Sequence, residues 1–81
     1  MSITVQVQYY ALLRERARVN VESVTTTAPD AATLYEELAA RHGFGLPRSM
    51  LRVAVNDEFS DWSRALADGD RVVFIPPVAG G

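Results

Sequence analysis

Near its beginning, in residues 3–9, the chain alternates apolar and polar residues with the period of a β-strand. In Ile3-Thr4-Val5-Gln6-Val7-Gln8-Tyr9 every second side chain is apolar, which predicts a strand with one buried face. Residues 19–25 are rich in β-branched side chains and predict a second strand, which would form a hairpin with the first. The mixed segment between them, residues 10–18, is typical of a turn or a short helix.

The next segment, residues 30–42, follows the period of a helix. Asp30 is a good N-cap residue, because its carboxylate can accept hydrogen bonds from the free amides of the first turn. Apolar side chains then recur at helical spacing, at Ala31, Leu34 and Leu38. Gly43 follows the last turn, where a left-handed residue commonly ends a helix. We therefore predict one main helix.

Further strands are predicted in the second half of the chain. Residues 51–55 alternate again, and a turn and a very short strand at Phe59 come after them. We expect residues 61–66 to make one helical turn. Asp68-Gly69-Asp70 is a strong turn signal, and residues 71–75 form the last strand.

The element order β-β-α-β-(β)-β predicts an α+β fold. One helix can cover one face of a mixed sheet of four to five strands, which makes a roll. The β-grasp arrangement, which is that of ubiquitin, places the first and last strands side by side in the centre of such a sheet. We expect residues 1–75 to form this domain, and residues 76–81 to form a flexible, extended C-terminal tail.

The last strand shows which face of the sheet is wet. Arg71 favours water, so Val72 and Phe74 should point under the helix, and Val73 and Ile75 should lie on the open face. A cluster of exposed apolar side chains is a candidate docking site for a partner. Scattered exposed aliphatic side chains are also ordinary in proteins, so the pattern alone leaves both interpretations open.

Composition excludes several classes of chemistry. The chain has 81 residues, no cysteine and one histidine, His42, which excludes disulfides, a thiolate nucleophile and any multi-histidine or cysteine metal site. All eight basic residues are arginine, so lysine chemistry would belong to a partner. The net charge of −2 gives no sign of a nucleic-acid surface. With no long apolar stretch or leader pattern, we expect no membrane contact and a cytoplasmic location.

The sequence ends in a segment suited to reach into a narrow channel. Pro76 and Pro77 lack the N–H that sheet pairing needs, and the side chains of Val78, Ala79, Gly80 and Gly81 then shrink to nothing. At about 3.3 Å per residue, such a tail spans roughly 20 Å. Its carboxylate, on Gly81, could be activated as an acyl-adenylate and converted to a thiocarboxylate. A frayed chain end is the simpler alternative.

Four segments together resemble one protein family. The turn and strand Asp68-Gly69-Asp70-Arg71-Val72, followed by Pro76-Pro77-Val78-Ala79-Gly80-Gly81, is similar to the end of the small subunit of molybdopterin synthase (MoaD type). Tyr9-Tyr10-Ala11-Leu12-Leu13-Arg14-Glu15 and Ala54-Val55-Asn56 resemble two further segments of that family in the same order. The similarity extends over the whole chain.

The resemblance implies a sulfur carrier that is not catalytic alone. An ATP-dependent activating enzyme (MoeB type) would adenylate Gly81, and a sulfur donor would supply the sulfur of a thiocarboxylate. The tail would then enter the large synthase subunit (MoaE type), in a heterotetramer, and give its sulfur to cyclic pyranopterin monophosphate. No tightly bound cofactor is implied. The resemblance also implies an apolar contact with the large subunit at Phe59 and next to Pro76.

Other functions stay open on the sequence. A sulfur carrier of thiazole synthesis (ThiS type) would use the same chemistry with another acceptor. A ubiquitin-like modifier that conjugates to lysines, or an interaction domain with an accidental Gly-Gly ending, would need no sulfur. Arg14, with Arg16 and Arg18, could bind an acidic partner surface or could be part of a solvated loop. We expect His42 to be a helix-end residue and Trp62 to be a packing residue.

Overall fold

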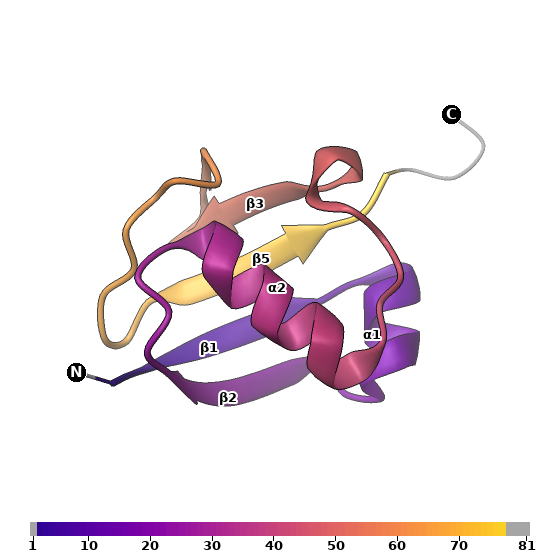
Figure 1. Ribbon diagram of the computed structural model, residues 1–81, viewed down its shortest axis with the longest axis horizontal. Coiled ribbons are helices and arrows are strands. Elements are labelled where there is room, and N and C mark those ends of the chain that lie inside the picture. Colours follow the sequence, from indigo (N-terminus) through magenta and orange to yellow (C-terminus); the bar gives the residue numbers. More distant parts are fainter. Residues whose placement is uncertain (1, 78–81) are drawn as a thin grey trace.

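The computed structural model describes residues 2–77 as a five-stranded sheet with two α-helices and one short 3-10 helix (Figure 1). The elements follow the chain in the order β1 (Ile3–Tyr9), α1 (Ala11–Ala17), β2 (Val21–Thr26), α2 (Ala31–His42), η1 (Arg48–Met50), β3 (Arg52–Val55), β4 (Glu58–Ser60) and β5 (Arg71–Ile75). None of the helices in this described part is long and apolar enough to cross a membrane.

The strands lie in the order β2-β1-β5-β3-β4. The central pair, β1 and β5, is parallel, whereas the β1–β2, β3–β4 and β3–β5 pairs are antiparallel. The first and last strands therefore lie side by side in the middle of a mixed sheet. The predicted α+β class and the β-grasp arrangement are both confirmed.

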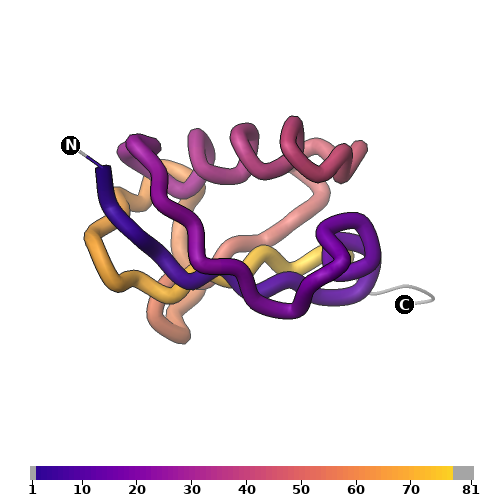
Figure 2. The backbone as a smooth tube through the Cα atoms, turned by 90° about the horizontal axis from the view of Figure 1, so that it is seen from below, coloured from indigo at the N-terminus to yellow at the C-terminus, as the bar shows by residue number. Residues whose placement is uncertain are grey.

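Helix α2 lies across one face of the sheet and leaves the other face open (Figure 2). Its Leu34, Tyr35 and Leu38 are buried against strand residues that include Val72 and Phe74. Both ends of α2 are capped as the sequence predicts. Thr33 N–H donates a 2.8 Å hydrogen bond to the Asp30 carboxylate, and Gly43 has a left-handed φ of 67°.

The predicted helical turn at residues 61–66 is wrong. This segment instead runs along the start of α2, where Ala65 forms an isolated bridge with Asp30. Ala31 N–H donates to the Arg64 carbonyl at 3.1 Å, and Ala32 N–H donates to the Trp62 carbonyl at 2.9 Å. The chain makes a tight turn here, with Arg64 N–H donating to the Asp61 carbonyl at 3.0 Å, but no helix forms. The first amides of a helix have no partner within it, and the carbonyls of this segment supply that partner.

Two smaller differences concern element bounds. The 3-10 helix Arg48–Met50 was not predicted, and β2 begins at Val21 rather than at residue 19. Trp62 packs against the core as expected, with its ring stacked 5.9 Å from that of Phe74.

Candidate functional site

The chain leaves the sheet from the end of its central strand. Because β1 and β5 are parallel, their carboxyl ends meet at one edge of the molecule, where α1 follows β1 directly (Figure 1). Strand β5 ends at Ile75, as expected from the two prolines; Pro76 is half-buried and Pro77 is exposed. The predicted site residues Val78, Ala79, Gly80 and Gly81 lie outside the described residues.

A row of side chains crosses the open face of the sheet. The pairing register aligns Val21, Gln8, Val73, Ala54 and Phe59 across the five strands. Phe59, on the edge strand β4, is 70% exposed, so the predicted exposure of this residue is confirmed. An aromatic ring this open on an edge strand is a candidate contact for a partner.

The expected exposure of Val73 is wrong. Its side chain is on the open face as predicted, because it is absent from the core cluster that holds Val72 and Phe74, but it is only 8% exposed. Val73 lies on the central strand between Gln8 and Ala54, and these neighbours leave a short branched side chain little access to water. Ile75, at the strand end, is half-buried and keeps partial access. A docking role for either residue stays a prediction.

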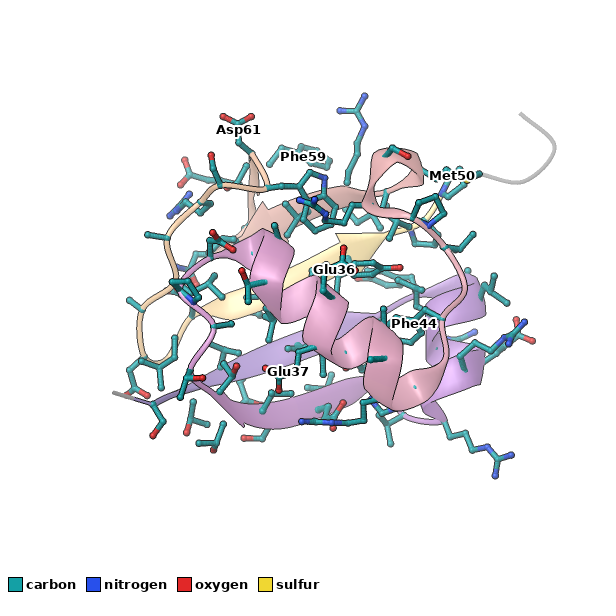
Figure 3. The ribbon with its side chains drawn as sticks, in the orientation of Figure 1. Glu36, Glu37, Phe44, Met50, Phe59 and Asp61 are labelled. Carbon is teal, nitrogen blue, oxygen red and sulfur yellow. The ribbon has the colours of Figure 1, made fainter. Side chains whose placement is uncertain are left out.

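A hollow of about 490 Å³ lies beside Phe59. It is lined by Arg52, Phe59, Ser60, Asp61, Ser63 and Arg64. Figure 3 shows Phe59 and Asp61 on the same side of the molecule, with the half-exposed Met50 lying farther toward the end of β5. Arg52 lines the hollow and is the cross-strand neighbour of Ile75. The hollow therefore lies near the place where the chain leaves the sheet.

Arg14 lies on α1, at the edge where β5 ends. Its side chain is exposed, as are those of Arg16 and Arg18. Within residues 2–77 none of these three arginines forms a salt bridge. The structure thus places a basic segment near the exit of the chain, and a role for Arg14 in binding a partner stays a prediction.

A polar cluster on the helix side of the sheet joins β1, β2 and α2. Tyr9 Oη donates to Glu22 at 2.7 Å, and His42 Nε2 lies 2.9 Å from the same carboxylate. Arg41 reaches the other Glu22 oxygen at 3.4 Å. Burial raises the pKa of the Tyr9 hydroxyl, and the hydrogen bond to Glu22 raises it further. His42 ends α2 as expected, and the cluster ties β1 and β2 to that helix.

This cluster predicts a loss of stability in acid. Partial burial acts to raise the pKa of Glu22, but the hydrogen bonds from Tyr9 and His42 outweigh it and hold this pKa below the ordinary 4.5. Glu22 therefore contributes stability above pH 4.5, and this contribution is lost as the pH falls through the lowered folded value.

We expect the free energy of unfolding of Glu22→Gln to fall less than that of the wild type when the pH is lowered below 4.5. Urea unfolding at a series of pH values measures this difference. Glu36→Gln is the matched control, since Glu36 is exposed and within residues 2–77 forms a salt bridge only with Arg48. If the free energy of unfolding of Glu22→Gln fell with pH as steeply as that of the wild type, the stabilising role of ionised Glu22 would be wrong.

Comparison with known proteins extends this picture. The sequence model of the ThiS family matches residues 7–81, which is nearly the whole chain. The chain belongs to the ThiS family. The match includes the tail residues that the structure does not describe, so the family assignment rests on both the fold and the C-terminal segment.

Three relatives illustrate the similarity. The molybdopterin synthase sulfur carrier subunit of Escherichia coli (strain K12) is 32% identical over 80 residues, which cover 95% of this chain and 99% of that protein. A candidate molybdopterin converting factor, subunit 1, from Pyrococcus furiosus has a TM-score of 0.80 at 30% identity, covering 94% of this chain and 99% of that one. The complex of subunits 1 and 2 of molybdopterin-converting factor from Helicobacter pylori contains a chain with a TM-score of 0.66 at 28% identity, covering 98% of this chain and 100% of that one.

These findings confirm the family resemblance seen in the sequence. They also confirm a ubiquitin-like β-grasp fold for this chain. The Helicobacter pylori structure pairs a similar chain with a second subunit, so proteins of this fold do assemble with a partner.

Proposed function

We propose that this protein is the sulfur-carrier subunit of a molybdopterin synthase and that its working group is the carboxylate of Gly81. The observation that carries the proposal is the family match through residue 81, together with a relative whose name states this role. The fold is consistent with it, since the chain leaves the sheet at Ile75, the last residue of the central strand β5.

The proposed cycle has two activation steps outside this protein. An ATP-dependent activating enzyme lets a carboxylate oxygen of Gly81 attack the α-phosphate of ATP, which forms an acyl-adenylate and releases pyrophosphate. A sulfur donor then delivers sulfide equivalents to the acyl carbon, AMP leaves, and a thiocarboxylate remains. The chain has no cysteine, so the thiocarboxylate is the place where it holds sulfur.

The acceptor step takes place on a partner. The tail enters the large synthase subunit, where the thiocarboxylate sulfur bonds to a carbon of cyclic pyranopterin monophosphate. Water then attacks the acyl carbon, the C–S bond to Gly81 breaks so that the sulfur stays on the pterin, and the carboxylate of Gly81 is regenerated. Catalytic amines of that step belong to the partner, because this chain has no lysine. The carrier therefore supplies sulfur and a docking surface, and the large subunit supplies the catalytic groups.

The form of Gly81 in cells tests the proposal directly. We expect intact-mass spectrometry of protein isolated from its native cells to show a fraction with one oxygen replaced by sulfur. This fraction should convert the pterin substrate only when the large subunit is added. Conjugates to lysines of other proteins would instead indicate a modifier, and transfer of the sulfur only into a thiazole would indicate the thiazole pathway.

Phe59 is the open-face residue whose loss should weaken docking most. Burying a phenylalanine is worth about 1.5–3 kcal/mol, which corresponds to roughly 10- to 100-fold in affinity. We expect Phe59→Ser to weaken binding to the large subunit by this factor, in titration calorimetry, with the melting temperature nearly unchanged because the ring is 70% exposed.

Val21→Ser is the matched control for this measurement. Val21 is also an exposed apolar residue of the open face, at 52%, but it lies on the opposite edge strand, β2. It should bind like the wild type. Equal losses in the two variants, or a large fall in the melting temperature of Phe59→Ser, would contradict the assigned docking surface.

A further inference from the structure

Two arginine side chains line the hollow beside Phe59. The Arg52 guanidinium lies over the Phe59 ring, 5.9 Å from its centroid. Arg64 Nη1 donates a 3.0 Å hydrogen bond to Ser60 Oγ. Both arginines line the same hollow, Arg52 within cation–π distance of the ring and Arg64 tied to Ser60.

Within residues 2–77 neither of these two cations forms a salt bridge. The salt bridges of this described part use Arg41, His42, Arg48 and Arg71, and neither Arg52 nor Arg64 has a carboxylate within 4.0 Å there. Among the described residues that line the hollow, Asp61 is the one that carries a carboxylate. Two guanidinium groups against one carboxylate leave the hollow with a net positive charge.

Docking over Phe59 would change the solvation of these groups. A partner that buries the ring also removes water from the guanidinium stacked on it, and an unpaired buried charge costs several kcal/mol. A guanidinium presents a planar fork of donors that matches a carboxylate in a bidentate pair. A partner surface that carries a carboxylate next to the pocket for the ring therefore offsets most of this desolvation cost.

We propose that the hollow between Arg52 and Arg64 receives an acidic side chain, aspartate or glutamate, of the protein that docks on Phe59. This inference rests on the proposed function, which makes that protein the large synthase subunit. Phe59 then supplies the apolar contact, and the two arginines favour partners that place a carboxylate in the hollow beside it.

Charge reversal at the hollow tests this inference. We expect Arg52→Glu to weaken binding to the large subunit by about 100-fold or more, and Arg52→Gln by about 30-fold, as measured by titration calorimetry. Arg64→Glu should act in the same direction. The melting temperature of both Arg52 variants should stay near that of the wild type, because the Arg52 side chain is exposed and makes no salt bridge in the described structure.

Arg71→Gln is the matched control. Arg71 is another exposed open-face arginine, but it is paired with Asp57 at the far end of β5 from Ile75. Its replacement should change the affinity by less than about threefold, the range of a surface ion pair. A lysine scan of the acidic residues on the large subunit should find one position whose replacement restores binding to Arg52→Glu.

The possible results separate the two proposals. If Arg52→Glu and Arg64→Glu bind like the wild type while Phe59→Ser binds weakly, the acidic contact is wrong and the docking surface stands. If the scan finds no restoring position, the acidic contact is also wrong. If the wild-type protein does not bind the large subunit at all, the proposed function itself fails.

Discussion

Removal of Gly81 is expected to abolish thiocarboxylate formation. The acyl carbon must reach the α-phosphate of ATP in a partner's active site, and deletion of one residue withdraws the terminal carboxylate by about 3.5 Å. A misplacement of about 1 Å can already cost 100-fold in rate. We therefore expect at least this loss in adenylation, measured by pyrophosphate exchange with the activating enzyme.

The same deletion should leave the domain folded. The sheet ends at Ile75, and the core cluster consists of residues that precede the tail. An Ala67→Gly variant, which changes an exposed position in the loop before β5, serves as the control and should be adenylated normally. Undiminished thiocarboxylate formation in the truncated protein would refute the assignment of Gly81 as the working group.

Replacement of Phe74 should cause the largest loss of stability in the molecule. Phe74 is fully buried on the central strand, with its ring centroid 5.2 Å from that of Tyr35 and 5.9 Å from that of Trp62. Phe-to-Ala changes in cores cost about 3–5 kcal/mol, and a small domain has a total stability of about 5–15 kcal/mol. We expect Phe74→Ala to lose about 3 kcal/mol or more in urea unfolding.

Phe59→Ala gives the matched comparison, since it makes the same chemical change at an exposed site. Its free energy of unfolding should stay within about 0.5 kcal/mol of the wild type. Similar losses for the two variants would mean that the open face and the helix-covered face are assigned the wrong way round.

Alternation along the strands made the two faces of the sheet predictable. Arg71 alone correctly assigned Val72 and Phe74 to the core and Val73 to the other side. Exposure was less predictable, because it depends on the strands that lie beside Val73 and not on the order of residues within its own strand. The same limit applies to Trp62 and Arg64, whose carbonyls accept hydrogen bonds from the first turn of α2, which begins much earlier in the chain, at Ala31.

The parts of the candidate site differ in the same way. The tail was predictable because its chemistry is contained in consecutive residues, from Pro76 to Gly81. The hollow was not, since Arg52 and Arg64 come together only when β3 and β4 pair and the chain turns after Ser60. The absence of lysine, with every cation an arginine, was the one available signal that planar charge recognition could matter here.

The parallel pairing of β1 with β5 has a consequence for how the chain folds. Contacts between these strands join residues at the two ends of the sequence; Gln6, for example, pairs with Arg71. The turn before β5 is joined to β1 as well, since Thr4 N–H donates to Asp68, 64 residues away. Such long-range closure has a large entropic cost, and proteins rich in distant contacts fold more slowly than helical bundles. The hairpin β1–β2 and helix α2 can form early, but β1 and β3 remain open edges until β5 enters between them. The strand that precedes the tail is thus also the strand that completes the sheet. The tail therefore follows a complete sheet only in a chain that has finished folding.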